Sequence, residues 1–128
     1  VSFGIRNLSQ LEMNYYKSNR NRVEIFWAKD KKNWDLNKLK KIFSGKNVYI
    51  TFDVDVFDSS IMPATGTPEP GGLMWEEVLP IIKKVCKISS IVGADINELA
   101  PIKNFNSYNF LVAKLAYKIL SYTFEFKR

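Results

Sequence analysis

The 128-residue sequence contains no histidine and a single cysteine, Cys86. No copy of the chain, alone or in a homo-oligomer, can therefore supply an imidazole. One cysteine cannot form an internal disulfide, which fits a reducing, cytoplasmic setting. No apolar stretch approaches the roughly 20 residues that span a bilayer, and the N-terminus lacks a signal-peptide pattern. We expect a cytoplasmic protein with no membrane partner.

Two common phosphate- and metal-binding motifs are also absent. No Gly-Lys-Ser or Gly-Lys-Thr follows a predicted strand, which excludes a P-loop. Counted from Asp53, positions 5, 6 and 12 of an EF-hand loop hold Phe57, Asp58 and Ala64. Because that loop requires an oxygen ligand, a Gly and a Glu at these positions, an EF-hand is excluded as well.

The chain is basic, with 19 Lys and Arg against 13 Asp and Glu and a net charge of +6. The lysines cluster in residues 29–32, 38–41 and 83–87. These segments lie on predicted helices and turns, where such charges usually form a solvated face. A nucleic-acid partner is therefore the less favoured interpretation, and a basic nucleic-acid-binding domain is kept as an alternative function.

Hydrophobic periodicity predicts strands that alternate with helices. Strands are expected at 2–6, 23–28, 48–52 and 90–96, and helices at 9–17, 36–43, 75–87 and 106–123. Ser9 and Glu12 have the spacing of a capping box, and Gly45 is expected to close the second helix. Pro80 lies far inside the third helix, where we expect a kink or a later start. This order predicts the α/β class, a three-layer α/β/α domain with a mostly parallel sheet, formed as a single domain by residues 1–128.

The most informative segment is 48–58, Val-Tyr-Ile-Thr-Phe-Asp-Val-Asp-Val-Phe-Asp, which precedes a Pro- and Gly-rich segment, 63–72. The apolar run 48–52 is typical of a strand buried on both faces of a parallel sheet. Asp53 and Asp55 are spaced i and i+2, so we expect both to project from one face at the carboxyl end, where open α/β sheets bind ligands. Two like charges this close call for a divalent cation or for protonation of one carboxyl. A salt-bridged strand end is the alternative interpretation.

Phe52–Asp58 together with Pro63–Leu73 resembles the second metal signature of the ureohydrolases, the family of arginase and agmatinase. The segment Thr67-Pro-Glu-Pro-Gly-Gly72 resembles the agmatinase branch more than it resembles the arginases. A second segment, Val92–Pro101, is similar to the last-strand motif of the same family. The resemblance runs over essentially the whole chain but over only the C-terminal half of such an enzyme. It implies the C-terminal half of the arginase-like fold.

The resemblance also implies roles for particular residues. Asp53 and Asp55 correspond to ligands of a centre of two Mn²⁺ ions, whose shared hydroxide attacks the guanidinium carbon and releases urea from agmatine or a similar guanidino compound. Glu98 corresponds to the carboxylate that binds the substrate guanidinium, and Thr65 and Thr67 to hydroxyls near the substrate. Two structural alternatives stay open: Glu98 as a surface residue at a strand end, and the threonines as part of a stiffened turn. Asp58 is expected to brace that turn.

The sequence departs from the family in its metal ligands. The family's site also uses two histidines and further aspartates from its N-terminal half, and the present chain has none of these. Two carboxylates alone hold Mn²⁺ weakly and do not build the paired site. In the family, the strand with those ligands lies between the first and third strands of this chain, so its absence leaves two unpaired strand edges that favour association.

We therefore expect an incomplete active site, which needs a separate N-terminal half or a longer parent chain, and a homo-oligomer rather than a strict monomer. The alternative function is a non-catalytic remnant of a ureohydrolase that serves as an interaction module.

Overall fold

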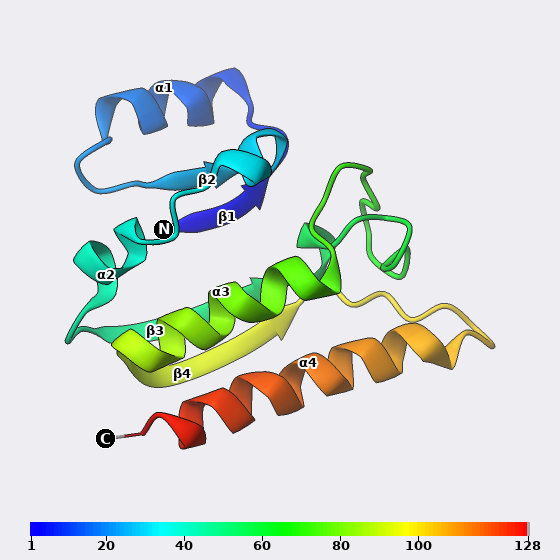
Figure 1. Ribbon diagram of the computed structural model, residues 1–128. Coiled ribbons are helices and arrows are strands. Elements are labelled where there is room, and N and C mark those ends of the chain that lie inside the picture. The colour runs from blue at the N-terminus through cyan, green and yellow to red at the C-terminus, as the bar shows by residue number, and fades with distance from the viewer. Residues whose placement is uncertain (128) are drawn as a thin grey trace.

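The computed structural model describes residues 1–127 and contains four strands and four α-helices in the expected order (Figure 1). Two short 3₁₀ turns, η1 and η2, follow β2 and β3. Along the chain the elements are β1 (Ser2–Ile5), α1 (Gln10–Ser18), β2 (Ile25–Trp27), η1 (Ala28–Asn33), α2 (Lys38–Phe43), β3 (Asn47–Asp53), η2 (Val54–Val56), α3 (Trp75–Ile88), β4 (Ser90–Asn97) and α4 (Asn106–Glu125).

The strands form two parallel pairs and not one continuous sheet. β1 pairs with β2, and β3 pairs with β4 in a register that places Asp53 opposite Asn97. Within residues 1–127, β1 and β3 have no strand between them. The parallel α/β class is confirmed, and the sheet is interrupted at the position where the sequence led us to expect a missing strand.

The main hydrophobic core lies between the β3–β4 pair and the two long helices, α3 and α4, which run along it in Figure 1. Val78, Ile81 and Ile82 of α3 recur at helical spacing on the buried side of that helix. Leu115 and Ile119 of α4 pack into the same cluster. A smaller cluster of Phe26, Leu39 and Val85 joins β2, α2 and α3, and so attaches the β1–β2 pair to the rest of the chain.

β3 is buried on only one face, so the expectation of a strand covered on both faces is wrong for this chain. Phe52 is 9% exposed, whereas Tyr49 is 58% exposed. The reason is that α3 and α4 cover the same face of the β3–β4 pair. On the open face, the hydroxyls of Tyr49 and Thr51 donate to the Asp95 carboxylate at 2.9 and 2.7 Å, and these hydrogen bonds lower the pKa of Asp95.

Helix ends follow most of the sequence signals. The Ser9 hydroxyl accepts from the Glu12 amide at 3.2 Å, the Glu12 carboxylate accepts from the Ser9 amide at 2.7 Å, and Gly45 has a φ of 70° after α2. The expected late start of α3 is wrong, because this helix begins at Trp75 and contains Pro80. A hydrogen bond from the Met74 amide to the Glu77 carboxylate, 2.7 Å, anchors the first turn ahead of the proline.

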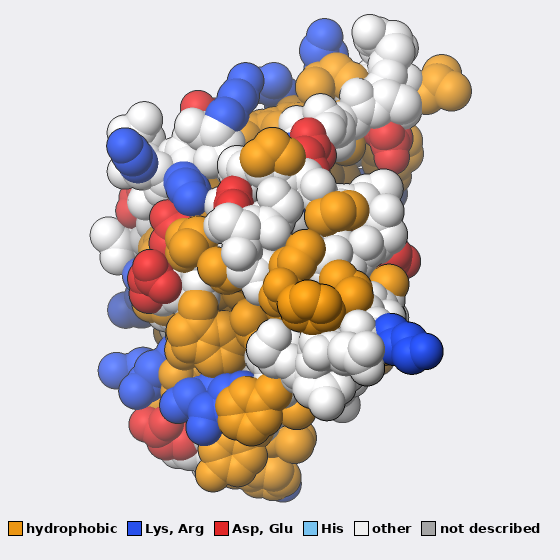
Figure 2. Space-filling model, turned by 90° about the vertical axis from the view of Figure 1, so that its right-hand side faces the viewer, with side chains coloured by type: hydrophobic (Ala, Val, Ile, Leu, Met, Phe, Trp, Pro, Cys, Tyr) orange, Lys and Arg blue, Asp and Glu red, His pale blue; other side chains and the backbone are white. Residues whose placement is uncertain are grey.

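The side of α4 away from the core is partly apolar, and Figure 2 shows hydrophobic side chains gathered at the bottom of the molecule, at the level of this helix. Lys114 lies over the ring of Tyr117, and Lys127 over the ring of Phe124. The large exposed hydrophobic residues of α4 are Phe110, Tyr117, Leu120 and Phe124. Even so, none of the helices within residues 1–127 has the length and apolar content that crossing a membrane requires.

Candidate functional site

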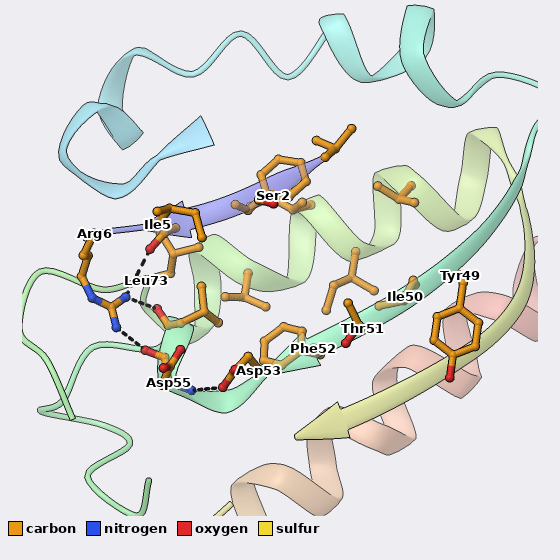
Figure 3. A pocket seen from close by; sticks show the side chains of 18 of the residues that line it. Ser2, Ile5, Arg6, Tyr49, Ile50, Thr51, Phe52, Asp53, Asp55 and Leu73 are labelled. Atoms are coloured by element: carbon orange, nitrogen blue, oxygen red, sulfur yellow. Dashed lines mark hydrogen bonds between the residues drawn. The ribbon is translucent and has the colours of Figure 1, made fainter. Parts of the chain in front are cut away.

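Asp53 and Asp55 come together through a turn and not through the pleat of a strand. β3 ends at Asp53, and η2 begins with the next residue. The Asp53 carboxylate accepts a hydrogen bond from the Asp55 amide at 3.2 Å and so caps this turn (Figure 3). The expected placement of both residues within one strand is therefore wrong, although both carboxylates lie at the carboxyl end of β3.

The two carboxylates differ in their surroundings. Asp53 is exposed, whereas Asp55 is half-buried. Burial raises the pKa of Asp55, the negative charge of Asp53 raises it further, and the Arg6 guanidinium opposes both effects. A cation placed between the two carboxylates would relieve this repulsion.

Arg6 is a residue of the site that the sequence interpretation missed. Its guanidinium extends from the end of β1 and donates to the carbonyls of Asp55 and Val56, the latter at 3.3 Å, and it lies 3.6 Å from the Glu69 carboxylate (Figure 3). It thus connects β1, η2 and the Pro- and Gly-rich segment. An available signal was its position directly after a strand, at the same edge of the fold as the aspartates.

Both aspartates border a cavity of about 840 Å³ that runs between β1 and β3 over α3. We call it the central groove. At its carboxyl end the groove is bordered by Arg6, Asp53, Asp55 and Thr67. Its remaining walls are apolar and are formed by residues such as Phe3, Ile5, Ile50, Phe52, Val78, Ile81, Ile82 and Val85.

Glu98 lies next to these residues but outside the lining of the central groove. It follows Asn97, which is opposite Asp53 in the strand register, and its carboxylate is exposed beside Gly66. Its φ is 65°, a left-handed conformation that is unfavourable for a residue with a side chain. Strained backbone of this kind is concentrated at functional sites, which is a reason to give Glu98 a functional role.

The two threonines lie on either side of Gly66 but in different environments. Thr67 is exposed and borders the central groove, and its hydroxyl is a minor influence that opposes the burial-driven rise in the pKa of Asp55. Thr65 is 8% exposed, does not line the groove, and its Oγ1 has no hydrogen-bond partner within residues 1–127. The structure therefore brings Thr67 to the aspartates and leaves Thr65 with an unsatisfied buried hydroxyl.

Asp58 braces the Pro- and Gly-rich segment and does not face the aspartates' cavity. Its carboxylate accepts from the amides of Ser60, Gly71 and Gly72 at 3.0, 2.7 and 3.1 Å, and from the Ser60 hydroxyl at 2.6 Å. These bonds lower the pKa of Asp58 to about 2, the hydroxyl and amide of Ser60 having the largest effect. The segment is thus a defined loop, and the Asp58 carboxylate joins its two ends.

The carboxylates of this chain do not make a metal site alone. Within residues 1–127 there is no group of three or more His, Cys, Asp or Glu side chains that could hold a metal ion. Asp53 and Asp55 offer oxygen donors, which suit Mn²⁺, but two residues do not fill the coordination of two ions. Two carboxylates of this kind could give at most part of a donor set.

Sequence comparison identifies the family to which these features belong. The model of the arginase family matches residues 1–121. The N(1)-aminopropylagmatine ureohydrolase of Synechocystis is 36% identical over 100% of the chain, and the agmatinase of Pyrococcus horikoshii is 32% identical over 92% of it. These matches cover 42% and 41% of the two relatives. The chain thus spans about two fifths of the length of the curated relatives that it matches.

Solved structures of agmatinases and arginases superpose on nearly the whole of this chain and on less than half of their own length. A putative agmatinase from Clostridium difficile superposes with a TM-score of 0.72 at 31% identity, over 94% of this chain and 44% of that one. The arginase from Medicago truncatula superposes with a TM-score of 0.78 at 26% identity, over 96% of this chain and 39% of that one. The Helicobacter pylori arginase, at 18% identity and a TM-score of 0.79, shows likeness of fold alone.

Proposed function

The chain belongs to the arginase family, and we propose that it forms the aspartate-bearing part of an agmatinase-like hydrolase that releases urea from agmatine or a similar guanidino compound. The observation that carries this proposal is the meeting of Asp53, Asp55 and Thr67 at one end of the central groove. The names of the relatives support the substrate class, since two relatives that match 92% or more of the chain are an aminopropylagmatine ureohydrolase and an agmatinase.

In this proposal, Asp53 and Asp55 bind the metal ions together with further donors from another polypeptide segment. The two Mn²⁺ ions that the family implies would supply a hydroxide nucleophile at neutral pH. The chain's own contribution is to hold two carboxylates in place: the Asp53 cap orients the turn, and Arg6 binds the backbone carbonyl of Asp55 from the other side. Neither interaction uses both oxygens of the carboxylates, which leaves oxygen lone pairs for a cation.

Glu98 is proposed to bind the substrate guanidinium. A carboxylate and a guanidinium pair through two parallel hydrogen bonds, and this fixes the plane of the substrate. Glu98 has a left-handed backbone conformation, and its carboxylate lies beside Gly66, which stands between the two threonines. A side chain at position 66 would narrow the space through which a substrate guanidinium reaches this carboxylate. Thr67 is proposed as a hydrogen-bonding partner of the substrate at the same place, and Thr65, which is buried two residues earlier, as a second hydroxyl near the substrate.

The active site is proposed to be completed by polypeptide that this chain does not contain. The sequence has no histidine, and the relatives are more than twice as long as the segment that matches. A cytoplasmic setting and a homo-oligomeric assembly stay predictions from the sequence.

The test is urea release in the presence of Mn²⁺, with agmatine and N(1)-aminopropylagmatine as substrates. We expect no urea from the chain alone, and release when it is co-expressed with the part of the Synechocystis ureohydrolase that it does not match. Asp53→Asn or Asp55→Asn in the complex should reduce the rate about 100-fold or more, whereas Asp30→Asn, at an exposed position of η1, should leave it unchanged.

Two results would contradict the proposal. One is a stable complex with bound Mn²⁺ that releases no urea from either substrate, which would favour a non-catalytic interaction module. The other is an Asp53→Asn, Asp55→Asn double variant with full activity.

A further inference from the structure

We propose that the outer side of α4 is a dimerisation surface, on which α4 of a second copy of this chain lies antiparallel. Five positions of the helix define this surface, and we call them the outer stripe: Phe110, Ala113, Tyr117, Leu120 and Phe124. The inference does not rest on the proposed hydrolase function, because it involves neither the aspartates nor the central groove.

The outer stripe has the spacing of a coiled-coil seam. Its members follow one another at intervals of three, four, three and four residues, and this is the repeat with which two helices interlock their side chains. All five positions are exposed, and the four large side chains are between 56% and 70% exposed. The stripe is therefore an apolar seam that has no partner within residues 1–127.

The outer stripe lies on the side of α4 opposite the core. Successive residues turn by roughly 100° around a helix, which places the stripe about half a turn away from the buried residues Leu115 and Ile119. In Figure 1, α4 is the outermost element on its side of the β3–β4 pair. Helices form the outer layers of α/β/α folds, so polypeptide that extends the sheet does not cover the outer side of such a helix. A separate molecule is therefore the occupant to consider.

The outer stripe is complementary to itself when two copies run antiparallel. A two-fold axis that passes between positions 118 and 119 places Phe124 of one copy opposite Ala113 of the other, and Tyr117 opposite Leu120. Each of these rings thus meets a smaller side chain, as close packing requires. A parallel arrangement places each ring opposite its own counterpart, so the sizes do not alternate across the seam.

The charges beside the outer stripe agree with the antiparallel arrangement. Lys114 and Lys127 lie over aromatic rings of the stripe, 5.5 and 5.8 Å from the ring centroids, and so flank the seam. In the antiparallel register Lys114 comes near Ser121 of the other copy, and Lys127 comes near an aromatic ring. Lys118, which is close to the two-fold axis, lies over the ring of Tyr122 beside the core. No lysine of the flanks therefore faces another lysine across the seam.

The size of the surface and the net charge determine the strength of the dimer. An aromatic side chain buries roughly 150–250 Å², so the exposed parts of the stripe offer roughly 500 Å² per copy. The resulting total of roughly 1,000 Å² is at the lower limit of a specific interface. Each copy carries a net charge of +6, which opposes association at low ionic strength. We therefore expect a dissociation constant of about 10–100 µM that decreases as salt is added.

The experiment is sedimentation velocity of the chain over about 5–500 µM, at low and at high NaCl concentration. We expect a monomer–dimer equilibrium whose dissociation constant falls at least about 3-fold at the higher salt concentration. The double substitution Tyr117→Gln, Leu120→Gln should raise this constant at least about 10-fold, because it removes the apolar centre of the seam. The matched control, Tyr15→Gln with Leu11→Gln, makes the same changes at exposed positions of α1 and should leave the constant unchanged.

Cysteine cross-linking tests the orientation of the two helices. In a Cys86→Ala background, the pair Ala113→Cys, Phe124→Cys should give a disulfide-linked dimer under mild oxidation, because the two positions lie opposite each other. Phe124→Cys alone should not, since the two copies of this position are then roughly 16 Å apart along the helices, beyond the reach of a disulfide. Cross-linking by the single variant would show a parallel arrangement and overturn the proposal.

Several results would overturn the inference without touching the proposed function, because none of these readouts depends on urea release. They are a chain that stays monomeric at about 500 µM, a dimer that salt weakens, and a dimer that the α4 and α1 substitutions affect equally. Loss of the cross-link in a complex with the unmatched part of the Synechocystis ureohydrolase would assign the outer stripe to that polypeptide instead. Circular dichroism checks the fold of each variant, and the cross-linking variants decide the matter even if the glutamine variant does not fold.

Discussion

At the residue scale, Arg6 connects the two halves of the fold. Its side chain is 12% exposed, and its guanidinium reaches the carbonyls of Gly4, Asp55 and Val56 as well as the Glu69 carboxylate. One planar group thus satisfies acceptors on three segments, which a lysine cannot do from a single ammonium.

Replacement of Arg6 by Leu should therefore destabilise the chain. We expect the free energy of unfolding to fall by about 2 kcal/mol, because partly buried carbonyls of η2 lose a charged donor, and Arg6→Lys should recover only part of the loss. Urea denaturation followed by circular dichroism measures this. Arg20→Leu serves as the control, since Arg20 lies over the Tyr16 ring on the exposed helix α1. Equal stability of Arg6→Leu and the unsubstituted chain would refute the connecting role.

Asp58 gives a prediction with a defined pH range. Its pKa in the folded chain is about 2, below the ordinary value of 3.8. A carboxyl whose folded pKa is depressed stabilises the fold above its unfolded pKa, and that contribution disappears as the pH falls through the folded pKa. Stability should therefore decrease between about pH 4 and pH 2, and Asp58→Asn should show a smaller decrease over this range. Asp30→Asn is the control, and a pH profile of Asp58→Asn that superposes on that of the unsubstituted chain would contradict the assignment.

At the scale of elements, the loop between η2 and α3 is defined by close backbone approach. A Cβ on Gly72 would lie 2.5 Å from the Asp58 nitrogen and 2.6 Å from the Phe57 oxygen, where the chain forms a parallel bridge between Phe57 and Leu73. Both contacts are with backbone, which cannot rotate away, so a glycine is required by packing at this position.

Gly72→Ala should consequently reduce the free energy of unfolding by about 1–3 kcal/mol, the usual effect of overpacking. Gly66→Ala provides a matched control in the same loop, because the nearest atom to its Cβ would be 3.7 Å away and its φ is not positive. Thermal and urea unfolding of the two variants measure the difference. Similar destabilisation by both substitutions would show that the contact with residues 57 and 58 does not determine the effect, because the entropy change of a Gly-to-Ala substitution by itself stabilises a fold.

At the scale of the whole molecule, the chain consists of two parallel pairs that are held together mainly by side chains. Besides Arg6, the Lys31 ammonium donates to the Gly72 carbonyl and to the Glu77 carboxylate, both at 2.9 Å. The β1–β2 pair has short strands, and α1 contributes no buried residue. The β3–β4 pair has longer strands and the main core.

This asymmetry predicts two levels of local stability. In the chain alone, amides of β1, β2 and α1 should exchange at least about 10-fold faster than those of β4, α3 and the buried turns of α4, because fewer apolar contacts have to open. Hydrogen exchange followed by proteolysis and mass spectrometry measures these rates, and the exchange rates of unstructured peptides serve as the reference. Uniform protection over both pairs would show that the connecting side chains make the fold a single cooperative unit.

Much of the fold and part of the site were predictable from the sequence. Apolar runs and helical spacing predicted the four strands and the four α-helices, and the pair Asp53 and Asp55 with its flanking loop indicated the family, since these signals depend on residues close together in the chain. Arg6 was missed because its acceptors lie about fifty positions away in sequence. The exposed face of β3 was missed because an apolar run does not reveal which neighbours are present to cover it.

The sequence by itself determined the alternating α/β order, the capped helices, the aspartate pair and the absence of any imidazole, because local propensity and composition decide these. Only the tertiary structure decided that a groove with an apolar floor lies between the two strand pairs, and that Asp53 and Asp55 meet through a turn held by Arg6. The physical reason is that strand pairing and cavity shape arise from contacts between distant segments, which a linear pattern does not specify.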